Sequence, residues 1–299
     1  MKKAIVLTAL CALSLQLSAQ TTMQFLGVNP DAETAAVAGT GIARPANAFA
    51  VESNMAAAAL SASKMAFGAG YDIWQPNASK TGIVSVGGFF RVGDNLAIGA
   101  GFKNFAEPEY TYASAEGRST TSFKPSEMAV SLGGAYKLSD AFSLGLDAKV
   151  ALSTLADFAK ATAVAADLTL AYSANGLSAG LAVSNIGGKV TYSGSDASYA
   201  LPMSARAGAA YSISGFTASV EADYIFSGGL MAGLGAEYWL KDIVAFRAGF
   251  HYGDSAKAIP TYASLGLGAK FAGVSLNAAY LLASETLGGT MMFGLAYAF

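Results

Sequence analysis

Apolar and polar residues alternate with a period of two over most of this chain. In the segment 230–240, Leu230 and Leu234 share one face, while Gly233 and Glu237 share the other. The apolar residues of a helix would recur every three or four positions instead. The alternation therefore predicts extended strands that each carry one apolar face.

Fourteen segments carry this pattern, and their number is even. The connections between them alternate between tight turns, such as Gly93-Asp94 and Lys241-Asp242, and longer polar stretches, such as 106–125 and 187–201. Tight turns at one rim and long loops at the other are typical of an antiparallel membrane barrel. The expected strands lie at about 64–74, 81–92, 95–105, 126–138, 140–152, 161–174, 176–186, 202–213, 215–226, 229–240, 243–252, 261–271, 273–283 and 289–299.

Composition supports strands that face lipid. Only 13% of the residues are charged, against about 25% in an average soluble domain, and the mean hydropathy is +0.42. After the first twenty residues, no uninterrupted apolar run is long enough for a membrane helix, which needs about 20 residues. A soluble β-sandwich would carry many charges on its outer face, whereas the second face here is mostly Gly, Ala and Ser. The predicted fold is all-β: a transmembrane antiparallel β-barrel of about 14 strands.

Both ends of the chain carry features of export to the outer membrane. Lys2 and Lys3 precede an apolar run that ends near Ala19, which predicts a signal peptide over residues 1–19. Cys11 lies inside this apolar run, so we interpret it as a signal residue and not as a lipid attachment site. The last segment places Tyr297 and Phe299 on one face. A final amphipathic strand that ends in Phe resembles the signal read by the barrel-assembly machinery of the outer membrane.

Residues 20–63 differ from the rest because they are rich in Ala and do not alternate. Pro30 and Asp31 suit the start of a short helix, Gly39 then breaks it, and residues 55–60 suit a second helix. The segment is apolar enough to need cover. We expect it to fold into the lumen as a plug ahead of the barrel at 64–299; a periplasmic tail is the alternative.

The face opposite the apolar one carries charges of both signs. Charged side chains are tolerated inside a barrel when they are paired or wet, and they are costly against lipid. We therefore expect these residues to line the lumen, either as a salt-bridged lining that holds a plug or as a selective path. They are Lys103, Asp147, Lys149, Asp167, Arg206, Glu221, Asp223, Glu237, Arg247 and, near a strand end, Lys270.

Aromatic residues gather near the ends of the expected strands, and rings in these positions suit the interfacial girdles of a membrane barrel. Small residues on the inner face leave space, either for a plug or for a slender ligand. Glycine pairs at 87–88, 133–134 and 228–229 are candidate strand kinks. The aromatic residues are Tyr71, Trp74, Phe89, Phe90, Tyr224, Phe226, Tyr238, Trp239, Phe250 and Tyr252.

The stretch 35–60, AAVAGTGIARPANAFAVESNMAAAAL, resembles the N-terminal hatch of the FadL superfamily, especially its PorV/PorQ branch. Gly39 and Gly41 match the glycines of the hatch pattern, and Asn54 opens Asn-Met-Ala where the family has Asn-Pro-Ala. The segments 184–187 and 233–253 match the later part of the family pattern. The resemblance implies a fourteen-stranded barrel with an N-terminal plug, located in the outer membrane of a didermal bacterium.

Composition also narrows the chemistry. A net charge of −2 gives no basic patch for nucleic acid, and one Cys and one His exclude a Cys/His metal cluster. No glycine-rich phosphate loop precedes a helix. We expect no cofactor, no metal and no enzymatic activity. His251, the one candidate for a Ser–His hydrolase, is interpreted as a histidine at the barrel rim without a catalytic role.

Two functions remain open, and the resemblance implies both. The first is an accessory role in protein secretion or surface attachment, in which a PorV/PorQ-type barrel of the type IX secretion system meets secreted cargo or secretion components through its long loops. The second is FadL-like transport of hydrophobic small molecules across the outer membrane. In either case the expected surroundings are outer-membrane lipid, with the barrel-assembly machinery as a partner during insertion.

Overall fold

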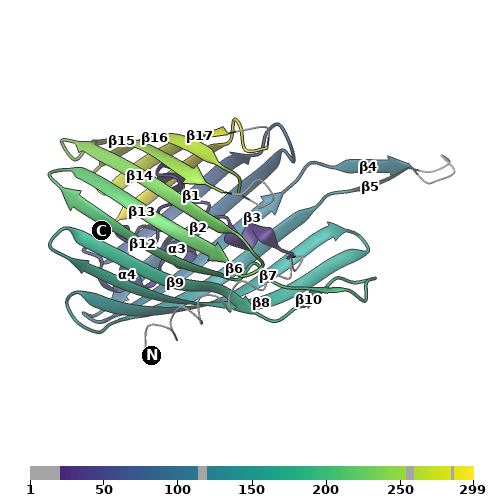
Figure 1. Cartoon of the computed structure of the whole chain (residues 1–299), viewed down its shortest axis with the longest axis horizontal. Coiled ribbons are helices and arrows are strands. Elements are labelled where there is room, and N and C mark those ends of the chain that lie inside the picture. Colours follow the sequence, from purple (N-terminus) through teal and green to yellow (C-terminus); the bar gives the residue numbers. More distant parts are fainter. Residues whose placement is uncertain (1–20, 114–119, 254–258, 284–285) are drawn as a thin grey trace, which may run out of the picture.

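The structure is a computed structural model that describes residues 21–113, 120–253, 259–283 and 286–299. The predicted signal peptide lies outside the described residues. Four short helical elements come first, and strands make up the remainder (Figure 1). The helical elements are η1 (Gln24–Gly27), α2 (Ala32–Ala36), α3 (Ala50–Ser53) and α4 (Ala56–Ala59).

Fourteen antiparallel strands form a closed barrel, which confirms the predicted fold class. Each strand pairs with its neighbours in the order β1-β18-β17-β16-β15-β14-β13-β12-β9-β8-β7-β6-β3-β2, so that β1 and β18 close the wall. The barrel strands are β1 (Met65–Trp74), β2 (Thr81–Val92), β3 (Leu96–Ala106), β6 (Ser126–Lys137), β7 (Phe142–Ala156), β8 (Ala159–Ala174), β9 (Leu177–Gly187), β12 (Ser204–Ile213), β13 (Phe216–Ile225), β14 (Leu230–Leu240), β15 (Val244–Tyr252), β16 (Tyr262–Phe271), β17 (Val274–Ala283) and β18 (Met291–Ala298).

The two faces of the wall follow the sequence alternation. On β7, Leu144 and Leu146 are 42% and 61% exposed on the outside, whereas Ser143 and Asp147 are buried inside. Exposed apolar side chains continue around the outer face of the barrel. An outer face of this kind is stable against lipid, because all backbone groups of a closed barrel are paired within the wall.

The aromatic girdle prediction is wrong for three residues, one of which is Trp239, whose ring faces into the lumen next to Arg247. Tyr71 and Phe250 face outward and are about half exposed, but Trp74 and Phe89 are buried inside the barrel. Neighbouring residues of a strand point to opposite faces, so two residues that are an odd number of positions apart at a strand end cannot both face the interface. Trp74 belongs instead to an apolar cluster within the lumen.

The two rims differ in their connections. Two-residue turns at Asn175-Gly176, Ser214-Gly215 and Ala272-Gly273 have both residues at positive φ, which is the backbone that matches the twist of a tight hairpin. We call this end the short-turn rim, and the C-terminus lies there (Figure 1). The opposite end, the long-loop rim, carries the longer connections.

Two connections at the long-loop rim contain strands that the sequence analysis had interpreted as loops. In the predicted loop 106–125, β4 (Tyr110–Ala113) pairs with β5 (Thr120–Phe123). In the predicted loop 187–201, β10 (Val190–Thr191) pairs with β11 (Ser198–Tyr199). These strands are too short for an alternating pattern to be recognised. The β4–β5 hairpin projects well beyond the rim (Figure 1).

The predicted glycine kinks are also wrong. The pairs 87–88 and 133–134 keep a continuous register with both neighbouring strands, and the pair 228–229 lies in the turn between β13 and β14. The register instead breaks between β8 and β9, next to Asp167. There Asn185 has a φ of 58°, and its backbone N–H donates to Asp167 Oδ1 at 2.8 Å instead of to the neighbouring strand.

No helix among the described residues is long and apolar enough to cross a membrane.

Candidate functional site

Residues 21–60 lie inside the barrel, and we call this segment the hatch. It begins near the long-loop rim, where Thr21 forms a parallel bridge with Ala200, and it leads to β1 at the short-turn rim, where Lys64 N–H donates to Phe299 O at 2.6 Å. Its helices contact strands on several sides of the wall. The hatch therefore runs along the lumen between the two rims.

The local sequence sets the start and end of the first hatch helix. Asp31 is the N-cap of α2, and its carboxylate accepts from the backbone N–H groups of Glu33 and Thr34. Such a cap satisfies donors that the first turn of a helix leaves unpaired. Gly39, at a φ of 80°, follows the end of the helix, and Gly41 lies against Thr34, where a Cβ would come within 2.8 Å of the Thr34 methyl group.

Small residues of the wall let the hatch approach closely. A Cβ on Gly180 would collide with the carbonyl oxygen of Ile42, and one on Gly249 would lie 2.6 Å from Ala38 Cβ. At this height, the space left by small inward residues is filled by the hatch backbone. Glycine at these wall positions is thus a requirement of packing and not of conformation.

A first ion-pair network joins the hatch to β14 and β15. Arg44 of the hatch lies 2.8 Å from Glu237 Oε2 and 3.3 Å from Glu33 Oε1. Arg247 binds the same oxygen of Glu237 at 2.5 Å, and its Nη1 donates to Asn277 Oδ1 at 2.8 Å. Two arginines and two glutamates balance one another, as buried charges require.

A second network joins the hatch to β12 and β13. Arg206 donates to Glu221 Oε1 at 2.6 Å and to the backbone oxygen of Ser53 at 3.3 Å. Glu221 in turn accepts from the backbone N–H of Ile42 at 2.9 Å. Asp223 lies farther out on β13, 3.8 Å from Arg206.

A third network surrounds Glu52 of α3. Lys103 on β3 binds Glu52 at 2.9 Å and also donates to the backbone oxygen of Val28 at 2.9 Å. Lys149 binds Asp167 at 2.6 Å. Burial opposes ionisation of Glu52, but the positive charges of Lys103 and Lys149 outweigh it and hold the pKa of Glu52 below its usual range.

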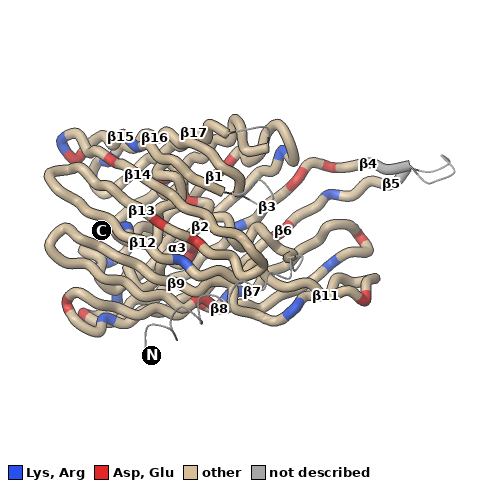
Figure 2. The backbone as a smooth tube through the Cα atoms, in the orientation of Figure 1, with Lys and Arg blue, Asp and Glu red and all other residues tan. Residues whose placement is uncertain are grey.

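Two predicted lining residues lie apart from these contacts. Asp147 is buried opposite Asp167 in the β7–β8 register, and its Oδ1 has no hydrogen-bond partner among the described residues. Lys270 is exposed near the short-turn rim. Figure 2 shows charged positions at the turns of both rims and in a group at mid-height near α3.

The sequence analysis did not single out the hatch residues Glu33, Arg44 and Glu52. Each carries a charge within an otherwise apolar, alanine-rich segment, and that contrast is the signal that marks them. Asn54, which was singled out, is buried and donates to the backbone oxygens of Ile42 at 2.7 Å and Leu170 at 3.3 Å. It thereby ties the hatch to β8.

At the chain end, the backbone oxygen of Phe299 accepts from the backbone N–H groups of Lys64 and Met65. The side chains of Tyr297 and Phe299 are 44% and 67% exposed on the outside of the barrel. The two backbone hydrogen bonds to Phe299 join the end of the hatch to the last strand. The proposal that both side chains serve as an assembly signal rests on their sequence position.

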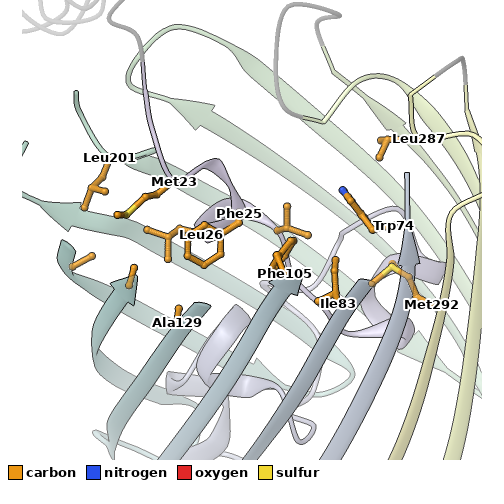
Figure 3. Close-up of a cluster of buried hydrophobic side chains, with 14 of the residues drawn as sticks. Met23, Phe25, Leu26, Trp74, Ile83, Phe105, Ala129, Leu201, Leu287 and Met292 are labelled. Carbon is orange, nitrogen blue, oxygen red and sulfur yellow. The ribbon is translucent and has the colours of Figure 1, made fainter. Parts of the chain in front are cut away.

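The hatch separates two hollows in the lumen that share no lining residue. The hollow toward the long-loop rim has a volume of about 700 Å³, and we call it the outer hollow. Met23, Phe25 and Leu26 of the hatch belong to the same buried cluster as Ile83 and Phe105 (Figure 3), and Leu26 also lines the outer hollow. The hollow toward the short-turn rim measures about 500 Å³ and is lined by Arg44, Trp239 and Lys270, among others.

His251 lies near the end of β15, faces inward and lines the outer hollow, where it is buried. Its ring stacks on Tyr262 with a centroid distance of 4.8 Å. No group of three or more His, Cys, Asp or Glu side chains in the described part of the chain is arranged to hold a metal ion.

Comparison with known proteins gives one family. The family described as "Type IX secretion system protein PorV" matches residues 14–214. No curated protein sequence matches the chain.

Solved structures with the same fold include a transporter, a hydrocarbon channel and a FadL homologue. The toluene transporter TodX of P. putida superposes with a TM-score of 0.67 at 14% identity, covering 89% of this chain and 97% of TodX. The monoaromatic hydrocarbon channel CymD gives 0.65 at 15% identity, with 93% and 98% covered. A FadL homologue of Pseudomonas aeruginosa gives 0.57 at 13% identity, with 90% and 95% covered. At these identities the likeness shows the fold alone.

Proposed function

The chain belongs to the PorV family of type IX secretion system proteins, and from that membership we propose that it is an accessory in protein secretion or surface attachment. It is an outer-membrane β-barrel with its tight turns at one rim and its long connections at the other. In such barrels the short turns face the periplasm and the long loops face the outside. The long-loop rim is accordingly the surface that would meet cargo or secretion components.

One observation carries this proposal beyond family membership: the hatch occupies the lumen between its two hollows. The hatch runs between the rims and is held by three buried ion-pair networks, through Arg44, Ile42 and Glu52. A polypeptide cannot pass such a lumen without removing these contacts. An accessory that works through its outer rim does not need an open lumen.

The β4–β5 hairpin is the part of the rim best placed for a protein contact. It stands outside the barrel (Figure 1) and pairs only with itself among the described strands. Tyr110 stacks on Phe123 at a centroid distance of 5.7 Å, and Tyr110 Oη donates to Glu107 at 2.9 Å. Unpaired strand edges are templates for pairing with another chain.

The test compares surface proteins in three strains. The first lacks the protein, the second carries the barrel with residues 110–123 replaced by a Gly-Ser turn, and the third carries Asp140→Asn at the opposite rim. The hairpin replacement leaves the β3–β6 pairing of the barrel intact. We expect the first two strains to lose the same surface proteins, at unchanged outer-membrane levels of the shortened barrel, while the third matches wild type. An unaltered surface proteome in the deletion strain would exclude the accessory role.

A second candidate function, transport of hydrophobic small molecules, is favoured by the outer hollow. Its volume of about 700 Å³ is within the range of small-molecule sites, and the fold is shared with channels for hydrocarbons. Passage across the membrane would require the hatch to move. Uptake of a radiolabelled hydrocarbon should then fall in the deletion strain, and wild-type uptake there would rule transport out. That the protein is not an enzyme stays a prediction.

A further inference from the structure

The outer hollow has two unlike walls. One wall is apolar and is formed by Trp74, Leu281 and Met292 of the barrel together with Leu26 of the hatch. The other wall is charged and is formed by β7, β8, β12 and β13. The charged residues that line it are Lys149, Asp167, Arg206, Glu221 and Asp223.

Negative charge is in excess on the charged wall. Lys149 pairs with Asp167 at 2.6 Å, and Arg206 pairs with Glu221 at 2.6 Å. The fourth carboxylate of the hollow, Glu52, is paired with Lys103. Asp223 has a distant contact of 3.8 Å to Arg206 and a hydrogen bond with Ser204, while its Oδ1 has no hydrogen-bond partner among the described residues.

His251 provides an independent sign of an incomplete site. The residue is 8% exposed. Its ring forms a hydrogen bond with the backbone of Ala38, while its Nε2 has no hydrogen-bond partner in the described part of the chain. A neutral imidazole that donates through one nitrogen accepts through the other. Apart from Glu52 Oε2, which is ion-paired with Lys103, the described lining residues thus offer two free acceptors, on β13 and β15, against one free donor, the amide of Asn29.

We propose that the outer hollow binds an amphipathic amine, with its apolar body against Trp74 and Met292 and its ammonium group at Asp223. A buried polar atom without a hydrogen-bond partner is costly in free energy. An ammonium group would give Asp223 both a hydrogen-bond donor and a close positive charge. A carboxylate ligand would instead meet Asp223 as a like charge. This proposal does not depend on the secretion role.

The test uses three probes that share one apolar body: 3-phenylpropylamine, 3-phenylpropionate and propylbenzene. The chain has two tryptophans, and Trp239 lines only the other hollow. In a Trp239→Phe barrel in lipid nanodiscs, Trp74 fluorescence therefore reports on the outer hollow, and calorimetry gives a second measurement. We expect saturable binding of the amine, at least about tenfold tighter than that of the carboxylate. A hydrogen bond to a charged group contributes enough free energy for a tenfold change in Kd.

Asp223→Asn keeps the shape of the side chain and removes its charge. It should weaken the binding of the amine about tenfold and leave the binding of propylbenzene unchanged. The control Asp140→Asn, at a side chain that is fully exposed at the other rim, should change the binding of neither probe. Equal or tighter binding of the carboxylate, an equal effect of Asp223→Asn on all probes, or no binding by either measurement would overturn the proposal. None of these results bears on the surface-protein test of the secretion role.

Discussion

The inner wall of the barrel holds the same hatch in two different ways. On β1, β2, β3, β17 and β18, the hatch packs mainly through apolar contacts, such as Phe25 on Phe105 at a ring centroid distance of 5.4 Å, and β3 adds one ion pair, from Lys103 to Glu52. On β12 to β15, it is held by directed contacts, such as Arg44 to Glu237 and Ile42 to Glu221. Apolar contacts vary in strength with the area buried, whereas a buried ion pair that loses one partner leaves an uncompensated charge. The charged side therefore sets the position of the hatch, and the apolar side contributes graded stability.

The strongest test removes one member of the charged side. Arg247→Met should destabilise the docked hatch by about 3–5 kcal/mol, because Glu237 keeps a buried charge with half of its partners. Hydrogen exchange of the amides at 34–42 should accelerate accordingly. The double variant Glu237→Gln/Arg247→Met keeps the Arg44–Glu33 pair and should lose less than Arg247→Met alone. An equal or larger loss in the double variant would contradict a directed contact.

The apolar side should respond by degrees. Ile83 is fully buried in the same cluster as Phe25 and Leu26 of the hatch. Ile83→Ala should cost about 2–5 kcal/mol and Ile83→Val about 1 kcal/mol, in proportion to the volume removed. Urea unfolding in lipid vesicles measures both. If the two variants were equally destabilised, graded packing would not describe this side.

A pH titration adds a smaller effect at the third network. Because the pKa of Glu52 is held below its usual range, its contribution is present above the pKa of an unfolded glutamate, about 4.3, and is lost as the pH falls through the lower folded value. After correction for the intrinsic pH dependence of amide exchange, hydrogen exchange at 49–56 should be constant from pH 7 to about 5 and rise only at stronger acid. Glu52→Gln should remove this rise; its persistence would assign it to another group.

The smallest effect is expected at the short-turn rim. Lys137 and Asp140 form an ion pair at 2.8 Å with the Asp140 side chain fully exposed, and the lysine lowers the pKa of Asp140 through a hydrogen bond. An exposed pair contributes little to stability. Asp140→Asn should leave the unfolding midpoint unchanged in urea, and a clear shift would show that this turn takes part in holding the barrel.

Period-two alternation was sufficient to predict the barrel. Each of the fourteen strands has a lipid face and a lumen face. The apolar Leu144 therefore lies on the outside and the polar Ser143 on the inside. The β4–β5 and β10–β11 hairpins escaped prediction because they are not part of the barrel wall and are too short for an alternating pattern to be recognised. The kink at Asn185 escaped because it depends on a hydrogen bond to Asp167 from another strand.

The site was less accessible to sequence reasoning. Charges on the strands could be assigned to the inner face by alternation, but their partners could not be assigned. Arg44, Glu33 and Glu52 lie in a segment without periodicity, and their contacts join residues far apart in the chain, such as Arg44 and Glu237. Trp74 was misplaced because a strand end suits both an interfacial ring and a lumen ring.

The separation of the two hollows by the hatch has an electrical consequence. Because the hatch lies between two hollows that share no lining residue, we expect ions to have no continuous aqueous path, and the protein reconstituted in a planar bilayer should show no steady conductance. A cell can then carry many copies of such a barrel in its outer membrane without leaking solutes or weakening the barrier against toxic molecules. Abundance at the surface and impermeability become compatible in one molecule.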